Sequence, residues 1–141
     1  MSRIYWDAIL FIYWLENNPQ YAERVGAIRT RMEERGDQLI TGTFTFGEVL
    51  AGPYHVGAVK VADESKRLLR SVVCEVVPFT IETADHYARI RGMLGLPPAD
   101  AIHLASAAQA GTDLFLTNDK NLIGKVVPGI QFIASLDTQL L

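Results

Sequence analysis

The sequence predicts an α/β fold, namely a three-layer α/β/α sandwich around a central, mostly parallel sheet of four to five strands. Short apolar runs alternate with longer segments of helical pattern along the whole chain, which is typical of a parallel sheet covered by helices. The 141 residues are 49% hydrophobic and 21% charged, enough for a full hydrophobic core. No repeat or linker divides the sequence, so we expect one domain over residues 1–141.

The expected strands are short apolar runs bounded by turn residues. They cover residues 2–6, 39–42, 74–78, 113–117 and, as a candidate fifth strand, 130–133. Helical patterns fill the intervals between them. These cover residues 8–16, 19–35, 44–51, 56–72, 80–94 and 98–110.

Capping residues set several of the expected helix ends. Asn18 precedes Pro19 at the start of the second helix, and Thr80 can cap the fifth. Gly52 and Pro53 should end the third helix, because proline cannot supply a backbone N–H. Glycine follows the second and the last helix, at Gly36 and Gly111.

Composition argues against several classes of protein. No apolar run approaches the ~20 residues that cross a bilayer, and residues 4–15 contain Asp7 and lack the flanks of a signal peptide. The single cysteine, Cys74, lies in an apolar run, which predicts a buried thiol in a reducing compartment. We therefore expect a cytoplasmic protein without a membrane partner. The net charge of -3 does not itself favour nucleic-acid binding, but several active-site carboxylates would account for it.

Four acidic residues should meet at one edge of the predicted sheet. Asp7 directly follows the first expected strand, and Asp119 follows the fourth. Glu48 lies in the short helix after the second strand, and Asp100 opens the helix before the fourth. Ligands of open parallel sheets bind beyond the carboxyl ends of the strands. These four residues are therefore the predicted catalytic and metal-binding set.

Each of these acids also has a structural interpretation. Asp7 and Asp119 could cap the segments that follow them, and Asp100 is favoured in a first helical turn by the macrodipole. Glu48 is different, because a glutamate between Phe46 and Val49 in mid-helix is neither a cap nor plainly exposed. The coincidence of all four is what favours a site.

Clustered carboxylates repel one another, and a cation relieves that repulsion. Oxygen ligands select hard divalent ions such as magnesium or manganese, which can activate water and stabilise charge on a phosphodiester. Zinc is disfavoured because one cysteine and three scattered histidines, His55, His86 and His103, form no zinc-ligand pattern.

The chain resembles PIN-domain proteins, and among them the toxin nucleases of VapBC toxin–antitoxin pairs. The resemblance spans essentially the whole chain through four segments: IYWDAILFIYWLE with Asp7, TFTFGEVLAG with Glu48, PPADAIHLASAAQAG with Asp100, and LFLTNDKNL with Asp119. It implies metal-dependent cleavage of RNA, with the carboxylates holding one or two Mg²⁺ or Mn²⁺ ions. Asp119 is the position that the family fills more loosely. The resemblance also implies a small antitoxin partner and a homodimer.

The sequence departs from the family directly after its first aspartate. The family often has a hydroxyl residue and an asparagine there, whereas this chain has Ala8 and Ile9. Fewer hydrogen bonds would then hold Asp7, which would weaken metal binding. The residues expected to compensate are Thr45, Thr117 and Asn118.

Two further groups have open interpretations. His103 lies one turn after Asp100 on the same helix face, where it either touches substrate or metal-bound water or, as we prefer, is a buried histidine with its hydrogen bonds satisfied. Four aromatic residues near the start are expected to pack in the core or an interface: Tyr5, Trp6, Tyr13 and Trp14.

Three other functions compete with a toxin ribonuclease. A housekeeping RNA-processing nuclease would use the same acids, and a catalytically silent binding module would explain Ala8 and Ile9. A phospho-accepting receiver domain shares the α/β layout, but it needs adjacent acids after the first strand and a lysine near the last, and neither is in place. The resemblance to the PIN-domain family favours the nuclease.

Overall fold

Five parallel strands form one sheet in the computed structural model, which describes residues 1–137. The strand order is β3-β2-β1-β4-β5, and every neighbouring pair is parallel. The strands are β1 (Arg3–Trp6), β2 (Gln38–Gly42), β3 (Glu75–Val77), β4 (Thr112–Thr117) and β5 (Ile130–Ser135). The predicted fold class is therefore confirmed, and the candidate fifth strand is present.

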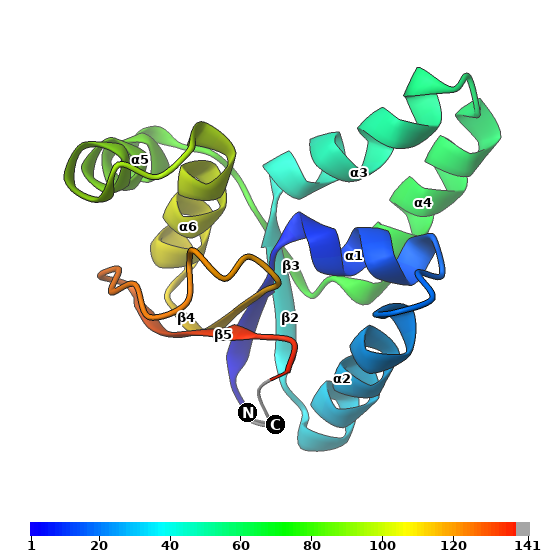
Figure 1. The fold of residues 1–141 in the computed structure, drawn as a ribbon, viewed down its shortest axis with the longest axis horizontal. Coiled ribbons are helices and arrows are strands. Elements are labelled where there is room, and N and C mark those ends of the chain that lie inside the picture. The colour runs from blue at the N-terminus through cyan, green and yellow to red at the C-terminus, as the bar shows by residue number, and fades with distance from the viewer. Residues whose placement is uncertain (138–141) are drawn as a thin grey trace.

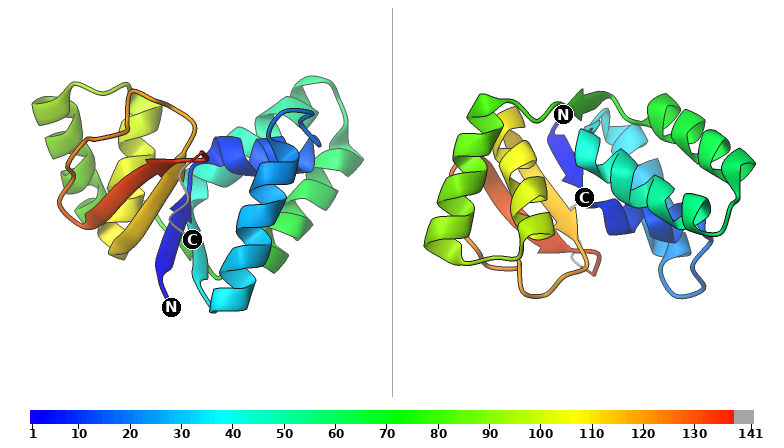
Figure 2. Two further views of the ribbon diagram at one scale, coloured as in Figure 1. Left: turned by 60° about the horizontal axis from the view of Figure 1, so that its bottom comes forward. Right: turned by 90° about the horizontal axis from the view of Figure 1, so that it is seen from above.

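Helices cover both faces of the sheet, as Figures 1 and 2 show. On one side lie α1 (Ala8–Leu15), α2 (Ala22–Arg35), α3 (Thr43–His55) and α4 (Val59–Val72). On the other side lie α5 (Ile81–Leu94) and α6 (Pro98–Ala110). None of the helices within residues 1–137 combines the length and the apolar character needed to span a bilayer.

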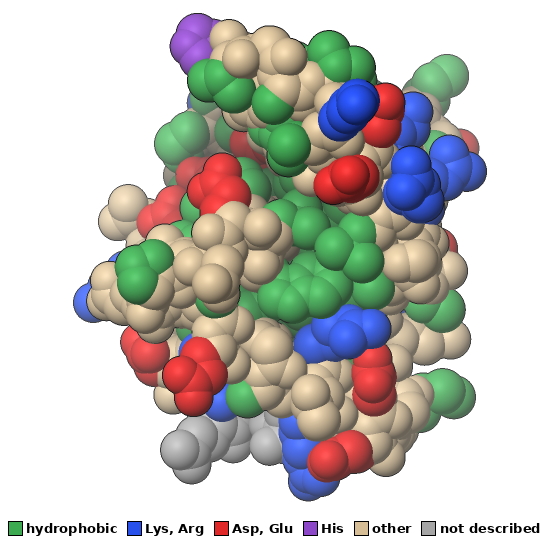
Figure 3. Space-filling view, turned by 90° about the vertical axis from the view of Figure 1, so that its right-hand side faces the viewer, with side chains coloured by type: hydrophobic (Ala, Val, Ile, Leu, Met, Phe, Trp, Pro, Cys, Tyr) green, Lys and Arg blue, Asp and Glu red, His purple; other side chains and the backbone are tan. Residues whose placement is uncertain are grey.

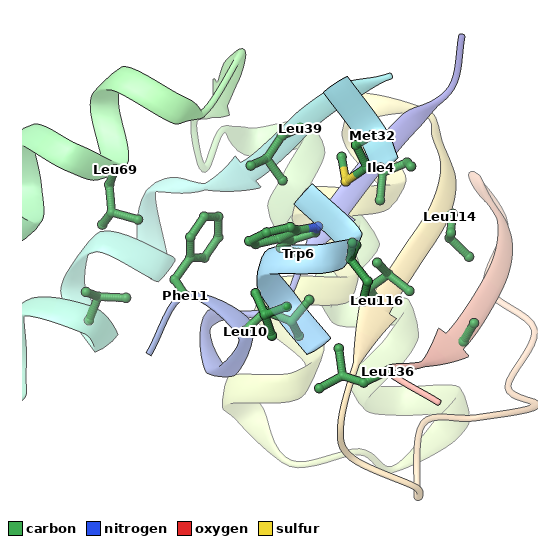
Figure 4. Close-up of a cluster of buried hydrophobic side chains, with 14 residues drawn as sticks. Ile4, Trp6, Leu10, Phe11, Met32, Leu39, Leu69, Leu114, Leu116 and Leu136 are labelled. Atoms are coloured by element: carbon green, nitrogen blue, oxygen red, sulfur yellow. The ribbon is translucent and has the colours of Figure 1, made fainter. Parts of the chain in front are cut away.

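Alternate residues of the central strands build two cores, because successive side chains of a strand point to opposite faces. Ile4 and Trp6 of β1 pack against α1 and α2, and Figure 4 shows Trp6 among the other side chains of this cluster. Tyr5, between them, packs on the other face against α5 and α6. All three side chains are fully buried, which agrees with the expectation that Tyr5 and Trp6 pack in the core or an interface.

Three of the predicted helix ends are wrong. The second helix begins at Ala22 and not at Pro19, because the side chain of Asn18 accepts the N–H groups of Gln20 and Tyr21 and closes a turn there. The third helix continues through Pro53 to His55. It ends where Gly57 takes a left-handed conformation with φ 73°, so the fourth helix begins later than expected, at Val59.

Other expectations about single residues have mixed outcomes. Thr80 caps α5 in a reciprocal capping box with Thr83, and Gly111 follows α6 in the left-handed conformation, as predicted. The prediction that Cys74 is buried is wrong, because its thiol is exposed. Cys74 precedes β3, which is an edge strand with a neighbour on one side only, so less of the fold covers it.

Candidate active site

The strand order changes direction at β1, and this places the carboxyl ends of β1 and β4 side by side. Tyr5 of β1 is in register with Phe115 of β4, and the N–H of Asp7 donates to the carbonyl oxygen of Leu116 at 3.0 Å. Ligands of open parallel sheets bind at such a switch point. Asp7 and Asp119, which follow these two strands, both lie there.

Asp7 occupies the N-cap position of α1, but its side chain makes no capping hydrogen bond. Its Oδ2 instead accepts a hydrogen bond from Thr117 Oγ1 at 2.8 Å. Burial raises the pKa of the Asp7 carboxyl; nearby His103 and the hydrogen bond from Thr117 oppose that rise, and the charge of Glu48 adds to it. The carboxylate is therefore turned toward the other acids and away from a capping role.

Asp119 both caps the turn that follows β4 and lies in the cluster of acids. Its Oδ1 accepts the N–H of Asn121 at 2.9 Å, which closes the turn after β4. Its own N–H donates to Thr117 Oγ1 at 3.0 Å. The Thr117 hydroxyl thus joins Asp7 and Asp119, two residues brought together by the β1–β4 pairing.

Asp100 lies in the first turn of α6, where it interacts with Asp7, after β1, and with Asp119, after β4. The pKa of its carboxyl is raised by burial first, and then by the negative charges of Asp119 and Asp7. The electrostatic interaction with His103 opposes this rise. The structure therefore brings three of the predicted acids close enough to repel one another.

Glu48 joins the cluster through His103. The Nε2 atom of His103 makes a short hydrogen bond with Glu48 Oε1 and lies 3.6 Å from Asp7 Oδ1. The His103 side chain is 3% exposed and that of Glu48 is 33% exposed. The preferred interpretation of His103, a buried histidine with its hydrogen bonds satisfied, agrees with this placement. Because His103 also contacts Glu48 and Asp7, it is part of the site as well as of the core.

Tyr5 completes the arrangement beneath the acids. Its hydroxyl lies 2.9 Å from His103 Nδ1 and accepts the N–H of Gly42 at 3.0 Å. Burial raises the pKa of the Tyr5 hydroxyl, so this group keeps its proton. Sequence reasoning placed Tyr5 in the core or an interface, because a tyrosine within an apolar strand carries no signal of a polar contact.

The three residues expected to support Asp7 have different surroundings. Thr117 donates to Asp7, and so supplies a hydroxyl although the usual residues after the aspartate are absent. Thr45 is buried and its hydroxyl lies 2.6 Å from that of Thr41. The amide of Asn118 donates to the Tyr13 hydroxyl at 2.9 Å.

The donor set suits a hard divalent ion held partly through water. Within residues 1–137, no three acidic, histidine or cysteine side chains are placed to bind one ion directly. Magnesium usually keeps several waters and uses only one or two carboxylates, so such a triad is not required. Burial is the main cause of the raised pKa values of Asp7 and Asp100, and the negative charges of neighbouring acids add to it; a bound cation would favour the ionised form of both groups. The four acids therefore suit a magnesium or manganese ion.

The model of the PIN domain family matches residues 4–126. The chain belongs to the PIN domain family. The match includes all four acids, so the segments that carried the resemblance lie inside the PIN domain. A search of curated protein sequences finds no significant match.

Solved structures share the fold of this PIN domain at low sequence identity. A crystal structure of VapBC2 from Rickettsia felis, bound to a DNA fragment from their promoter, is 12% identical with a TM-score of 0.71. The alignment covers 94% of this chain and 98% of that chain. A toxin–antitoxin complex from Klebsiella pneumoniae is 18% identical with a TM-score of 0.64, covering 90% and 94% respectively.

Proposed function

We propose that this PIN domain is a ribonuclease that depends on Mg²⁺ or Mn²⁺ and cleaves RNA phosphodiester bonds. The observation that carries the proposal is the meeting of Asp7, Asp100 and Asp119 at the β1–β4 switch point, where burial and then the charges of Asp119 and Asp7 raise the pKa of Asp100. Burying charges of one sign together is unfavourable for folding alone. A cation-binding role explains why the fold tolerates it.

Asp7, Glu48, Asp100 and Asp119 are the residues that would hold the ion. The bound ion would supply an activated water and stabilise the negative charge that develops on the phosphate. Thr117 orients the Asp7 carboxylate through its hydroxyl, and it also binds the backbone N–H of Asp119. Asp7 and Asp100 must both be ionised to bind the cation. Cation binding should therefore release any protons that these two carboxyl groups carry.

The test is cleavage of a labelled RNA by the purified protein with Mg²⁺, with Mn²⁺ and with chelator. Asp100→Asn should abolish cleavage, because it removes a carboxylate from the cluster while a first-turn asparagine remains compatible with the helix. Asp63→Asn, on the exposed face of α4, is the matched control and should cleave like the unchanged protein. Cleavage in chelator, or by the Asp100→Asn protein, would overturn the proposed site.

The proposal extends to a biological role as the toxin of a VapBC-type toxin–antitoxin pair. Its support is the similarity of fold to VapBC2 and to a toxin–antitoxin complex. Expression of the chain alone in a bacterial host should then arrest growth, and expression of Asp100→Asn should not. Normal growth with abundant, active nuclease would instead favour a housekeeping RNA-processing enzyme. Folded protein without nuclease activity would favour a silent binding module.

A small antitoxin is the proposed partner that restrains this activity. An apolar groove of about 420 Å³ runs between α1, α3 and α4, with Ile12, Leu15, Val49, Pro53, Val56 and Val61 in its walls. Figure 3 shows hydrophobic side chains gathered in the middle of the face on this side of the molecule. An amphipathic antitoxin segment would bury these side chains. A basic residue of that segment could pair with the acids.

A homodimer, as in the family resemblance, is proposed as the assembly of the free toxin. Light scattering of the purified protein should give twice the mass of the 15.6 kDa chain. A monomer at micromolar concentration would contradict it.

A further inference from the structure

We propose that Tyr5 and His103 are positioning residues for Glu48: the Tyr5 hydroxyl fixes the His103 ring so that the Nε2 proton points at the Glu48 carboxylate. The proposal rests on the proposed function, in which Glu48 helps to hold the divalent ion. Neither residue belongs to the four acids, and both are buried beneath them.

The direction of the hydrogen bonds follows from the donors available. The backbone N–H of Gly42 can only donate, and its acceptor is Tyr5 Oη at 3.0 Å. The hydroxyls of Thr41 and Thr45 also interact with Tyr5, and we assign the proton of the Tyr5 hydroxyl to His103 Nδ1, which lies 2.9 Å away. A neutral imidazole that accepts at Nδ1 carries its proton on Nε2. Nε2 is the atom that faces Glu48 Oε1 and, at 3.6 Å, Asp7 Oδ1.

The opposite tautomer would be unfavourable at this position. With the proton on Nδ1, the lone pair of Nε2 would face the carboxylate oxygen of Glu48 in direct contact. A charged acceptor beside a lone pair is repelled, whereas an N–H donor to the same carboxylate makes a charge-assisted hydrogen bond. Tyr5 and Glu48 therefore select the same tautomer from the two sides of the ring.

The Tyr5 ring has little freedom to move away from this role. It stacks on Phe115 with centroids 5.1 Å apart and planes 10° apart, in a fully buried position. Residue 42 must also be glycine for the backbone to approach it. A Cβ there would lie 2.8 Å from Tyr5 Oη and 3.1 Å from Ser106 Oγ. The packing of β1 and β2 therefore fixes the position of the Tyr5 hydroxyl, independently of the acids.

The side chain that the His103 hydrogen bond restrains is Glu48. Glu48 projects from α3 with a long, flexible side chain that is one-third exposed, so several rotamers are open to it. A hydrogen bond to a rigid, buried donor selects one of them. Outer groups that orient ligand side chains in this way commonly change metal affinity by 10–100-fold when they are removed.

The experiment measures the tautomer and the binding of manganese separately. Long-range ¹H–¹⁵N NMR spectra of the metal-free protein should show His103 with an unprotonated Nδ1 and a protonated Nε2. Calorimetry with MnCl₂ should give an affinity about tenfold lower for Tyr5→Phe than for the unchanged protein. Tyr87→Phe is the matched control, because the Tyr87 hydroxyl makes no hydrogen bond within residues 1–137, and it should bind Mn²⁺ normally.

A second pair of variants tests the same chain of contacts at His103. His103→Gln keeps an N–H donor that can reach Glu48 and should retain more Mn²⁺ affinity than His103→Leu, which has none. This pair and the spectrum of the unchanged protein decide the matter even if Tyr5→Phe does not fold. A His103 protonated on Nδ1 alone, or equal Mn²⁺ affinity in the Leu and Gln proteins, would overturn the inference. Absence of Mn²⁺ binding by the unchanged protein would instead contradict the proposed metal site, and the tautomer would still be tested.

Discussion

The pKa of the Asp7 carboxyl is set by neighbours that act in opposite directions. Burial and the charge of Glu48 raise its pKa, whereas His103 and the Thr117 hydroxyl lower it, and the net direction is a rise from the ordinary value of 3.8. A carboxyl group with a raised pKa binds its proton more tightly in the folded state than in the unfolded state. It therefore contributes stability at low pH and loses that contribution as pH rises through the folded-state pKa.

We predict that Asp7→Asn stabilises the metal-free protein at neutral pH. The gain should be present above the folded-state pKa of Asp7 and should vanish as pH falls below 3.8, where aspartate is protonated in both states. Each pKa unit of the rise corresponds to about 1.4 kcal/mol. Denaturant unfolding of both proteins with chelator, at several pH values, measures the difference. A loss of stability at neutral pH would mean that Asp7 is structural.

Thr117 is the residue that we expect to couple two of the acids. Thr117→Val keeps the shape of the side chain but removes a buried hydroxyl that donates to Asp7 and accepts from the N–H of Asp119. Leaving these groups unpaired should lower the free energy of unfolding by about 1–3 kcal/mol and weaken Mn²⁺ binding. Thr117→Ser retains the hydroxyl and should restore both properties. If Val and Ser behave alike in Mn²⁺ binding, the hydroxyl does not support the site.

At the scale of single elements, α2 contains two glycines with opposite requirements. Gly26 lies inside the helix, and a Cβ there would meet nothing within 4 Å. Gly36 ends the helix with φ 72°, in the left-handed region that L-residues disfavour. The same substitution should therefore act in opposite directions ten positions apart.

We predict that Gly26→Ala raises the free energy of unfolding by about 0.5–1 kcal/mol, because alanine loses less backbone entropy in a helix. Gly36→Ala should lower it by about 1–2 kcal/mol, because a Cβ is strained in the left-handed conformation. Both positions are far from the acids in sequence, so Mn²⁺ binding serves as the control and should not change. Denaturation curves with equal m-values would measure the two effects; the same sign for both would contradict the assigned backbone conformations.

At the scale of the whole molecule, the acids belong to elements that only the complete fold brings together. Asp7 and Thr117 are separated by 110 residues and touch because β1 pairs with β4. An unfolded chain therefore cannot reproduce the cluster. An ion that binds it must stabilise the folded state selectively.

We predict that MgCl₂ raises the melting temperature of the protein. At a free concentration of about 100 times Kd, the stabilisation should be about 2.7 kcal/mol, or roughly 8 °C for a chain of this length. NaCl at the same ionic strength is the control for screening, and Asp100→Asn should respond less to magnesium. An unmoved melting temperature, together with destabilisation by every neutralised acid, would show that the four residues are structural.

The sequence by itself determined the fold class and the chain order of the elements. Apolar runs and helical patterns alternate, and this periodicity depends on local residue type. Thr80, Gly36 and Gly111 act through nearby backbone groups, so their positions predicted helix ends correctly. Local signals failed where a competing contact was stronger, as at Asn18, whose side chain closes a turn before α2.

Only the tertiary structure decided how the acids are joined. The sequence patterns placed Asp7, Glu48, Asp100 and Asp119 near one edge of a sheet, but they did not predict the strand order that sets their neighbours. The pairing of β1 with β4 gives Asp7 its hydrogen bond from Thr117, and the packing of α6 on β1 brings His103 onto Tyr5. Such contacts depend on residues about a hundred positions apart, and no local pattern encodes them because the chain must fold before they exist.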